Sequence, residues 1–212
     1  CFEAGQTISV FMNESTSSPI AILAFGDELK SNASEAIASL HQLNIRTVML
    51  SGDNTAAANR VGHAISIDEV FAQILPNNKA DIIRKLQSSK QDGKRQWVAM
   101  VGDGVNDAPA LASADVGMAM STGTDVAMQA AGITLMRGDP SLVADAIDIS
   151  KRTWKKIQQN LFWAFIFNAT GIPMAALGYL SPMLAGSAMA LSSFCVLSNA
   201  LLLKRWRPNH RQ

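Results

Sequence analysis

The chain has 212 residues and a formal net charge of +1, and 17% of its residues are charged. This length holds one ordinary domain, or a small domain with an additional element, and the nearly neutral charge gives no indication of a nucleic-acid partner. The two cysteines, Cys1 and Cys195, are too few and too distant in the sequence to indicate a disulfide framework. The first residues lack the features of a signal peptide and do not begin with methionine, so we expect the chain to be part of a longer protein.

Short apolar runs alternate with helical patterns before residue 140. Residues 8–14 and 19–26 are expected to pair as strands, and residues 32–43 have the apolar spacing of a helix, with Asn32 and Glu35 as a capping box. Further strands are expected at 46–50, 69–74, 96–101, 115–120 and 133–136, and further helices at 55–65, 76–87, 106–114 and 123–131. Repeated strand–helix units predict an α/β fold with a Rossmann-like parallel sheet and helices on both faces.

Acidic side chains follow two of these strands. Asp53 lies in SGDN, and Asp103 and Asp107 lie in GDGVND. Ligands of open parallel sheets bind at the carboxyl ends of the strands, and Lys79 could reach the same edge. Taken singly, each aspartate could be a helix cap and Lys79 a solvated lysine. Together they favour a site for Mg²⁺ and phosphate, which the backbone could approach closely at three glycines: Gly52, Gly102 and Gly104.

The 47 residues from Ile157 to Leu203 contain no charged residue and no histidine. A bilayer span needs about 20 apolar residues, so this stretch accommodates two spans, expected at 160–179 and 183–203 with a turn at GYLSP. A buried helical hairpin of a soluble protein is the alternative, although small soluble domains seldom contain such a stretch. Basic residues flank the stretch and predict that both ends face the cytoplasm; they are Lys151, Arg152, Lys155, Lys156, Lys204, Arg205 and Arg207.

A helix that begins near Pro140 meets no helix breaker before the first span, and we expect it to enter the membrane as a stalk. The predicted organisation is an α/β domain at 1–139, a stalk helix at 140–159, two transmembrane helices at 160–203 and a cytoplasmic tail at 204–212. The chain is therefore expected to be an integral membrane protein with both termini in the cytoplasm.

Polar groups inside a membrane span are costly and indicate functional sites. Asn168 lies in the first expected span, and Met189 and Ser193 lie four residues apart on one face of the second. An antiparallel pair with a tight turn would bring Asn168 and Met189 to depths that differ by roughly 5 Å. A thioether suits Cu(I) and suits Ca²⁺, Na⁺ or K⁺ poorly. Packing of Met189 and helix–helix hydrogen bonding by Ser193 are the alternatives.

The strings SGDN, LPNNK and MVGDGVNDAPAL, followed by apolar spans, resemble the P-type ATPases, whose phosphorylation domain belongs to the haloacid dehalogenase superfamily. The resemblance implies that Asp103 and Asp107 ligate Mg²⁺. It implies five catalytic residues, which are Asp53, Lys79, Asp103, Asn106 and Asp107. It also implies that the phosphoryl group is bound by Gly52, Asp53 and Lys79. Asp27, in GDELK, would lie at the hinge toward the stalk.

The family forms an aspartyl-phosphate on the Asp of a DKTGT motif, and this string does not occur in the chain. In the family, that motif, the nucleotide-binding domain and the earlier membrane helices lie upstream. We therefore expect the carboxyl-terminal part of a pump, in which residues 1–139 are the carboxyl-terminal part of the phosphorylation domain. This part would stabilise the phosphoryl group electrostatically but would lack the nucleophile, so it is expected to be inactive alone.

The strings NLFWAF, GIP, MALSS and SNAL resemble the final two spans of the copper-transporting branch of the heavy-metal P-type ATPases. In that branch an Asn, the Met and the Ser four residues later line the Cu(I) pathway, which implies Asn168, Met189 and Ser193 here. Phe167 stands where the branch commonly has Tyr, the turn is shorter than expected, and the Cys-Pro-Cys pair of the branch would lie upstream. Cys195 is not part of the pattern; its expected role is packing, with a soft auxiliary ligand as the alternative.

The resemblance implies an ATP-driven Cu(I)-exporting ATPase in the cell membrane. Its cofactors would be Mg²⁺ and ATP, the latter bound mainly by the upstream domain, and Cu(I) would be the transported ion. Its partners would be the lipid bilayer, the upstream remainder of the pump and, as a possibility, a copper donor protein, but not nucleic acid. A Zn²⁺ or Cd²⁺ pump of the same family is one alternative, which an acidic residue in the last span would favour. A membrane-anchored phosphatase or a non-catalytic remnant is another.

Overall fold

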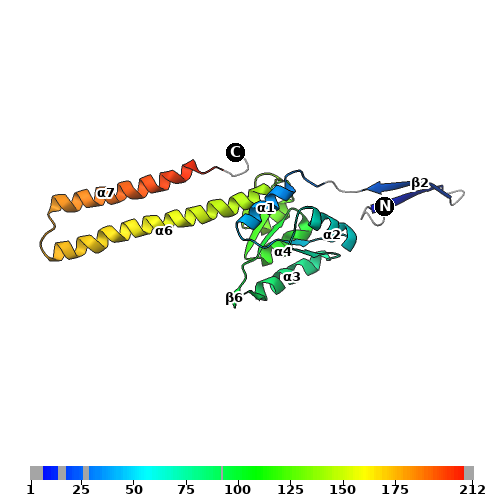
Figure 1. The fold of residues 1–212 in the computed structure, drawn as a ribbon, viewed down its shortest axis with the longest axis horizontal. Helices are drawn as coiled ribbons and strands as arrows, with labels where there is room; N and C mark the ends of the chain where they lie inside the picture. The colour runs from blue at the N-terminus through cyan, green and yellow to red at the C-terminus, as the bar shows by residue number, and fades with distance from the viewer. Residues whose placement is uncertain (1–6, 14–17, 26–28, 92, 208–212) are drawn as a thin grey trace. The chain divides into compact units, whose positions relative to one another are not determined.

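The computed structural model describes residues 7–13, 18–25, 29–91 and 93–207 (Figure 1). Two compact units divide the chain, at residues 1–144 and 145–212. The expected hinge residue Asp27 lies outside the described residues. The first unit holds the strands and short helices, and the second consists mainly of two long helices.

The two strands expected near the amino terminus are present. β1 (Thr7–Asn13) and β2 (Ser18–Phe25) pair antiparallel, with Thr7 opposite Phe25 and an irregular register between Phe11 and Met12. Several of their apolar side chains, including those of Phe11 and Ile22, are exposed.

Parallel strands and connecting helices form the rest of the first unit. The strands are β3 (Val48–Leu50), β4 (Glu69–Phe71), β7 (Ala99–Gly102), β8 (Val116–Met120) and β9 (Ile133–Leu135). The helices are α1 (Ala33–Gln42), α2 (Thr55–Ala64), α3 (Pro76–Ser88), α4 (Ala108–Ser113) and α5 (Asp125–Ala130), with a 3₁₀ turn η1 (Val105–Asp107) before α4. β3 pairs with β4, and β8 pairs with both β7 and β9, always in parallel. The predicted α/β fold with parallel strands is confirmed.

The core of this unit lies around β8, the central strand of its three-stranded sheet. Met118 and Ala119 are buried, and Ala119 packs with Leu111 of α4 and Ala127 of α5. Gly117 brings α4 still closer, because a Cβ at this position would lie 2.6 Å from the carbonyl oxygen of Leu111. Small residues therefore let the helices pack directly against the strand.

Two aspartates each join the starts of two neighbouring strands by a hydrogen bond from the backbone. Asp68 precedes β4, and its Oδ2 accepts from the backbone N–H of Thr47, which precedes β3, at 2.7 Å. Asp115 precedes β8, and its Oδ2 accepts from the backbone N–H of Val98, which precedes β7, at 2.9 Å. In each case this backbone hydrogen bond is the main cause that lowers the pKa of the carboxyl group below its usual value.

Two local features differ from those expected. The capping box at Asn32 is wrong, because this side chain makes no capping bond to α1 and donates from Nδ2 to Asp139 Oδ1 at 2.5 Å. A hairpin of β5 (Lys90–Gln91) and β6 (Lys94–Arg95) also follows α3, where no strand was expected. It is only two residues long on each side, too short for a periodic pattern.

The second unit contains the carboxyl-terminal helices. The helix expected to begin near Pro140 is present as α6 (Ser141–Ala176), a single helix that contains Pro173. The chain turns at Gly178, whose φ is +77°, and α7 (Pro182–Leu201) follows, with a 3₁₀ turn η2 (Leu202–Arg205) at its end. Ser181 caps α7, since its side chain accepts from the backbone N–H of Leu184 at 3.3 Å.

Within the part of the chain that the structure describes, one helical stretch is long and apolar enough to cross a membrane. It runs from Pro182 to Arg205, with a mean hydropathy of 1.6, and none of its apolar window is buried inside the protein. α6 does not reach the same hydropathy, because Asn160, Asn168 and Thr170 interrupt its apolar part. The second of the two expected spans is thus supported by composition, and the first stays a prediction.

The bond between Asp115 and Val98 predicts a pH-dependent contribution to stability. Because the folded-state pKa of Asp115 is lowered, its contribution is present above the unfolded pKa of about 3.9 and is lost as the pH falls through the folded value. At pH 7, Asp115→Asn should speed amide hydrogen exchange in β7 and β8 by roughly 5–30-fold, equivalent to about 1–2 kcal/mol. The control is Asp81→Asn, which removes an exposed carboxylate from α3. Equal exchange in the two variants would show that Asp115 does not fasten these strands.

Candidate functional site

Lys79 and Asp107, two of the expected site residues, form an ion pair between separate elements. Lys79 lies in the first turn of α3, which begins at Pro76 after β4, and Asp107 ends the 3₁₀ turn that follows β7. Lys79 Nζ donates to Asp107 Oδ1 at 2.7 Å, and only 16% and 14% of the two side chains are exposed. The pair therefore joins the carboxyl ends of two strands, at the edge predicted to bind phosphate.

The backbone around Gly102 makes room for Asp107. A Cβ on Gly102 would lie 2.8 Å from the Cβ of Asp107, closer than side chains approach each other. The N–H of Gly104 points at the second carboxylate oxygen of Asp107, at the long distance of 3.5 Å. Gly102 is thus required for the position of Asp107, whereas Gly104 has more space, with Asp107 Oδ2 3.7 Å from an added Cβ.

The loop after β8 holds the backbone of Asp103. The N–H of Thr124 donates to the carbonyl oxygen of Asp103 at 2.9 Å. Gly123 packs so closely that a Cβ there would lie 2.1 Å from the same oxygen. The sequence analysis missed this loop; the signal was the string STGT at the carboxyl end of the strand beside β7. The Asp103 side chain itself is exposed.

The loops after β3 and β4 are joined by backbone hydrogen bonds. The N–H of Gln73 donates to the carbonyl oxygen of Asp53, and the N–H of Ile74 donates to that of Ser51, both at 2.9 Å. Ser51 Oγ donates to Asp53 Oδ2 at 2.8 Å and orients the exposed carboxylate. The loop that carries Gly52 and Asp53 is therefore fixed to the loop that leads into α3 and Lys79.

These three loop regions form one edge, which we call the strand-end site: residues 51–53, 73–79 and 102–107, with 122–124 behind Asp103. Among the described residues, no three His, Cys, Asp or Glu side chains are grouped so as to hold a metal ion by themselves. Asp103 and Asp107 nevertheless suit Mg²⁺, a cation that takes one or two protein carboxylates and completes its shell with water and phosphate oxygens. Asn106 is exposed on the same turn. The ligand roles predicted for these residues remain predictions.

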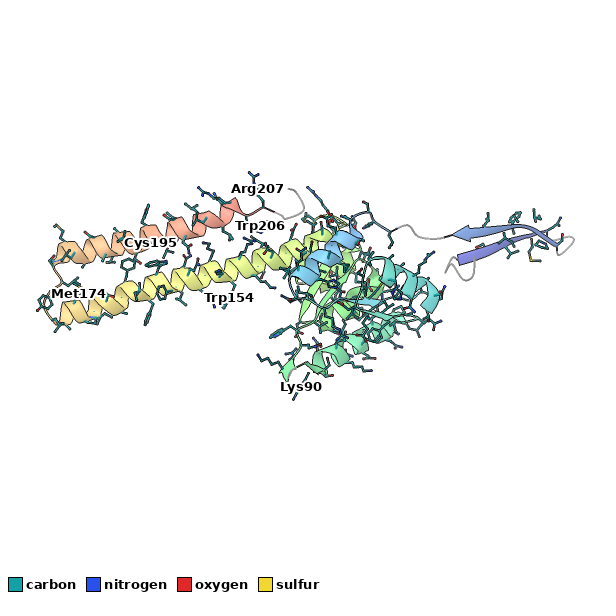
Figure 2. The ribbon with its side chains drawn as sticks, viewed as in Figure 1. Lys90, Trp154, Met174, Cys195, Trp206 and Arg207 are labelled. Atoms are coloured by element: carbon teal, nitrogen blue, oxygen red, sulfur yellow. The ribbon has the colours of Figure 1, made fainter. Side chains whose placement is uncertain are left out.

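A groove between α6 and α7 brings together the three residues expected in the ion pathway. It has a volume of about 450 Å³ and is lined by Phe167, Asn168, Gly171, Ile172, Ala175, Leu180, Ala185, Ala188, Met189, Ser192 and Ser193. The two helices run antiparallel beside it, with Met174 near the end of α6 and Cys195 along α7 (Figure 2). Ser192 was not expected from the sequence, although it lies four residues after Ala188, on the same helix face.

The polar atoms of the groove are partly held by their own helices. Asn168 Nδ2 donates to the carbonyl oxygen of Ala164 at 2.9 Å, which directs the amide nitrogen along α6. Ser193 Oγ donates to the carbonyl oxygen of Met189 at 3.1 Å. Met189 itself is 73% exposed. Cys195 is half-buried and is not among the lining residues.

Comparisons with known proteins give consistent results for most of the chain. The family model of the haloacid dehalogenase-like hydrolases matches residues 3–115. A copper-exporting P-type ATPase of Staphylococcus haemolyticus is 53% identical over 186 residues, which are 88% of this chain. A copper-exporting P-type ATPase of Staphylococcus aureus (strain bovine RF122 / ET3-1) is 54% identical over 191 residues, or 90% of this chain. The chain spans 23% of the length of each of these relatives.

A solved structure resembles both units. The crystal structure of a zinc-transporting PIB-type ATPase in the E2.Pi state matches with a TM-score of 0.82 and 32% sequence identity, over 96% of this chain and 32% of that chain. The expected resemblance to heavy-metal P-type ATPases, with copper-exporting pumps among the relatives, is confirmed.

The contact between Gly102 and Asp107 predicts different effects for two neighbouring glycines. Gly102→Ala should push Asp107 away, so that Lys79 Nζ and Asp107 Oδ1 lie more than about 4 Å apart and no longer form an ion pair. Gly104→Ala should leave the 2.7 Å contact in place. Structures of both variants would give the two distances. An intact ion pair in Gly102→Ala would contradict the requirement for glycine.

Proposed function

Since the chain belongs to the haloacid dehalogenase-like hydrolase family, we propose that it is the carboxyl-terminal part of an ATP-driven Cu(I)-exporting P-type ATPase. In this proposal it contributes the Mg²⁺–phosphate site and part of the copper pathway. The observation that carries the proposal is the half-buried Lys79–Asp107 pair at the carboxyl ends of parallel strands, in a chain that also has a groove with Asn168 and Met189. The identity of 53–54% to copper-exporting pumps supports the choice of ion.

At the strand-end site, each residue would act on a phosphoryl group through charge or position. Asp103 and Asp107 would hold Mg²⁺, which when bound neutralises negative charge on the phosphoryl oxygens. The Lys79 ammonium, already directed at this edge by Asp107, would add a second positive charge. The loop with Gly52 and Asp53 would position the group from the β3 side, because it is fixed to the loop before α3.

The nucleophile would come from another part of the pump. The string DKTGT, which carries the phosphorylated aspartate in P-type ATPases, does not occur in the 212 residues. The strand-end site supplies electrostatic stabilisation and positioning but no acceptor for the phosphoryl group. We therefore propose that turnover requires the remainder of the pump, which would also make most of the contacts with ATP.

In the membrane part, Asn168, Met189 and Ser193 would line the copper pathway. The thioether of Met189 is the soft ligand among them and would make the strongest contact with Cu(I), whereas amide and hydroxyl oxygens bind it weakly. Both flanking basic clusters would face the cytoplasm, and the turn at Gly178 would face outward. In this proposal the chain would lie in the cell membrane, with the lipid bilayer and the rest of the pump as partners.

A zinc pump is the second candidate, because the solved structure with a TM-score of 0.82 belongs to a zinc-transporting ATPase. Zn²⁺ binds carboxylates as well as nitrogen and sulfur ligands, whereas Cu(I) is selected by soft sulfur ligands. No Asp or Glu lies between Ile157 and Leu203. Together with the higher identity to copper-exporting relatives, this composition favours copper.

The magnesium role predicts that Asp103→Asn abolishes phosphoenzyme turnover in the complete pump. The substitution removes one negative charge from the metal shell while it keeps the size of the side chain. ATPase activity should fall by at least about 100-fold, as when a main electrostatic group is removed from an active site. Asp81→Asn, on the exposed face of α3, should retain activity. Activity of Asp103→Asn equal to that of the wild type would exclude Asp103 as a magnesium ligand.

The copper role predicts that Met189→Leu loses Cu(I) stimulation. Leucine keeps the apolar bulk of the side chain but removes the sulfur, so Cu(I)-stimulated ATPase activity of the complete pump should fall about tenfold or more. Cys195→Ala also removes a sulfur from α7, but at a position that does not line the groove, and should retain most of the stimulation. Full stimulation in Met189→Leu would assign this residue to packing and would remove the main support for copper.

A further inference from the structure

A chain of three polar side chains connects α6 to α7. Lys156 Nζ donates to Asn199 Oδ1 at 2.6 Å, and Asn199 Nδ2 donates to Asn160 Oδ1 at 2.8 Å. All three residues are half-buried, and the bonded partners lie 43 and 39 positions apart in the sequence. We call these three residues the polar clamp.

The clamp can form in only one register of the two helices. A lysine ammonium is a donor only, so it selects the oxygen of the Asn199 amide and leaves the nitrogen to face Asn160. A shift of α7 by one residue would move Asn199 by about 1.5 Å and turn it by roughly 100°. Both hydrogen bonds would then be lost together.

The rest of the interface between the helices specifies register weakly. Apart from Phe167, the half-buried helical positions that line the groove are small: Gly171 on α6, and Ala185, Ala188 and Ser192 on α7. Small residues allow helices in a membrane to approach each other, but they pack at several offsets. A single polar residue among apolar neighbours fixes the register of coiled coils in the same way.

A second contact supports the arrangement at the same end of the helices. Trp206, just after η2, donates from Nε1 to Asp148 Oδ2 at 2.7 Å, and Arg152 donates to the same oxygen at 2.7 Å. Asp148 and Arg152 precede the uncharged stretch, as Lys156 does. The fixed end of the pair is therefore the end that the basic residues flank.

The register set by the clamp determines which residues of α6 and α7 face each other across the groove. Asn160 lies about 12 Å along α6 from Asn168, and Asn199 lies about 9 Å along α7 from Ser193. We infer that Lys156, Asn160 and Asn199 are positioning residues that keep Met189 and Ser193 opposite Asn168. This inference rests on the proposed function for the role of the groove, but the clamp itself does not depend on the ion.

Two neighbouring lysines provide a matched test in the complete pump. Lys156→Met removes the lysine of the clamp and its hydrogen bond to Asn199, whereas Lys155→Met removes the same charge from an exposed position. Register is measured from cysteines at Gly171 and Ala188, two lining positions of which Gly171 has open space around it, in a Cys195→Ala background. A short bifunctional thiol reagent joins them, and mass spectrometry quantifies the linked peptides, so cysteines elsewhere do not interfere.

We expect Lys155→Met to keep the linked peptide and Lys156→Met to lose most of it. Asn199→Leu should behave as Lys156→Met does, whereas Asn199→Asp, which can pair with Lys156, should retain the link. In the same clamp variants without the two added cysteines, whose thiols would themselves bind Cu(I), the Cu(I) concentration for half-maximal ATPase stimulation should rise about 10–100-fold for those that lose the link. Phosphoenzyme formation from inorganic phosphate should persist in all of them, which shows that the variants fold.

Equal linking in Lys156→Met and Lys155→Met would overturn the clamp. Lost linking with an unchanged Cu(I) requirement would overturn its positioning role. A wild-type pump that Cu(I) does not stimulate would contradict the proposed function instead, and the linking experiment would still decide whether the clamp sets the register.

Discussion

The ion pair between Lys79 and Asp107 is the interaction on which the strand-end site depends. It is the contact through which α3, entered from β4, meets the turn that follows β7. Without a positive partner, the carboxylate of Asp107, only 14% exposed, would leave an uncompensated charge, which is electrostatically unfavourable. The close packing of Gly102 against Asp107 and of Gly123 against the backbone of Asp103 then fixes the position of this turn. Charge and close backbone packing together shape the strand-end site, at which we propose that a cation and a phosphoryl group bind.

The second unit follows a different constraint, because specific polar contacts join its two long helices. Small and large side chains together line the groove, and polar side chains outside its lining carry the specific contacts between the helices. Hydrogen bonds are directional, whereas contacts between small apolar residues are not, so the polar groups determine which residues face each other. Asn168 and Met189 line the same groove, and in the proposed copper pathway their juxtaposition would follow from this register.

Features that depend on local pattern could be predicted from the sequence. The strands before Asp53 and Asp103 can be recognised because an apolar run is followed by Gly-Asp. The apolar stretch of α7 can be recognised by its composition alone. The contacts of Asn32 with Asp139, of Gly123 with Asp103 and of Asn199 with Lys156 could not be predicted, because each joins residues 20 or more positions apart or depends on backbone packing. In Asn32 the long-range partner replaced the local cap that its position in the sequence favoured.

Hydrogen exchange of the complete pump with Mg²⁺ and orthovanadate, a phosphate analogue, tests the strand-end site most directly. If Lys79, Asp103 and Asp107 surround the bound phosphoryl group, amide exchange should slow in residues 76–80 and in residues 103–108 together. The hairpin of β5 and β6, which lies outside the site, should be unaffected. Slowed exchange elsewhere in the pump, with both of these segments unchanged, would contradict the account.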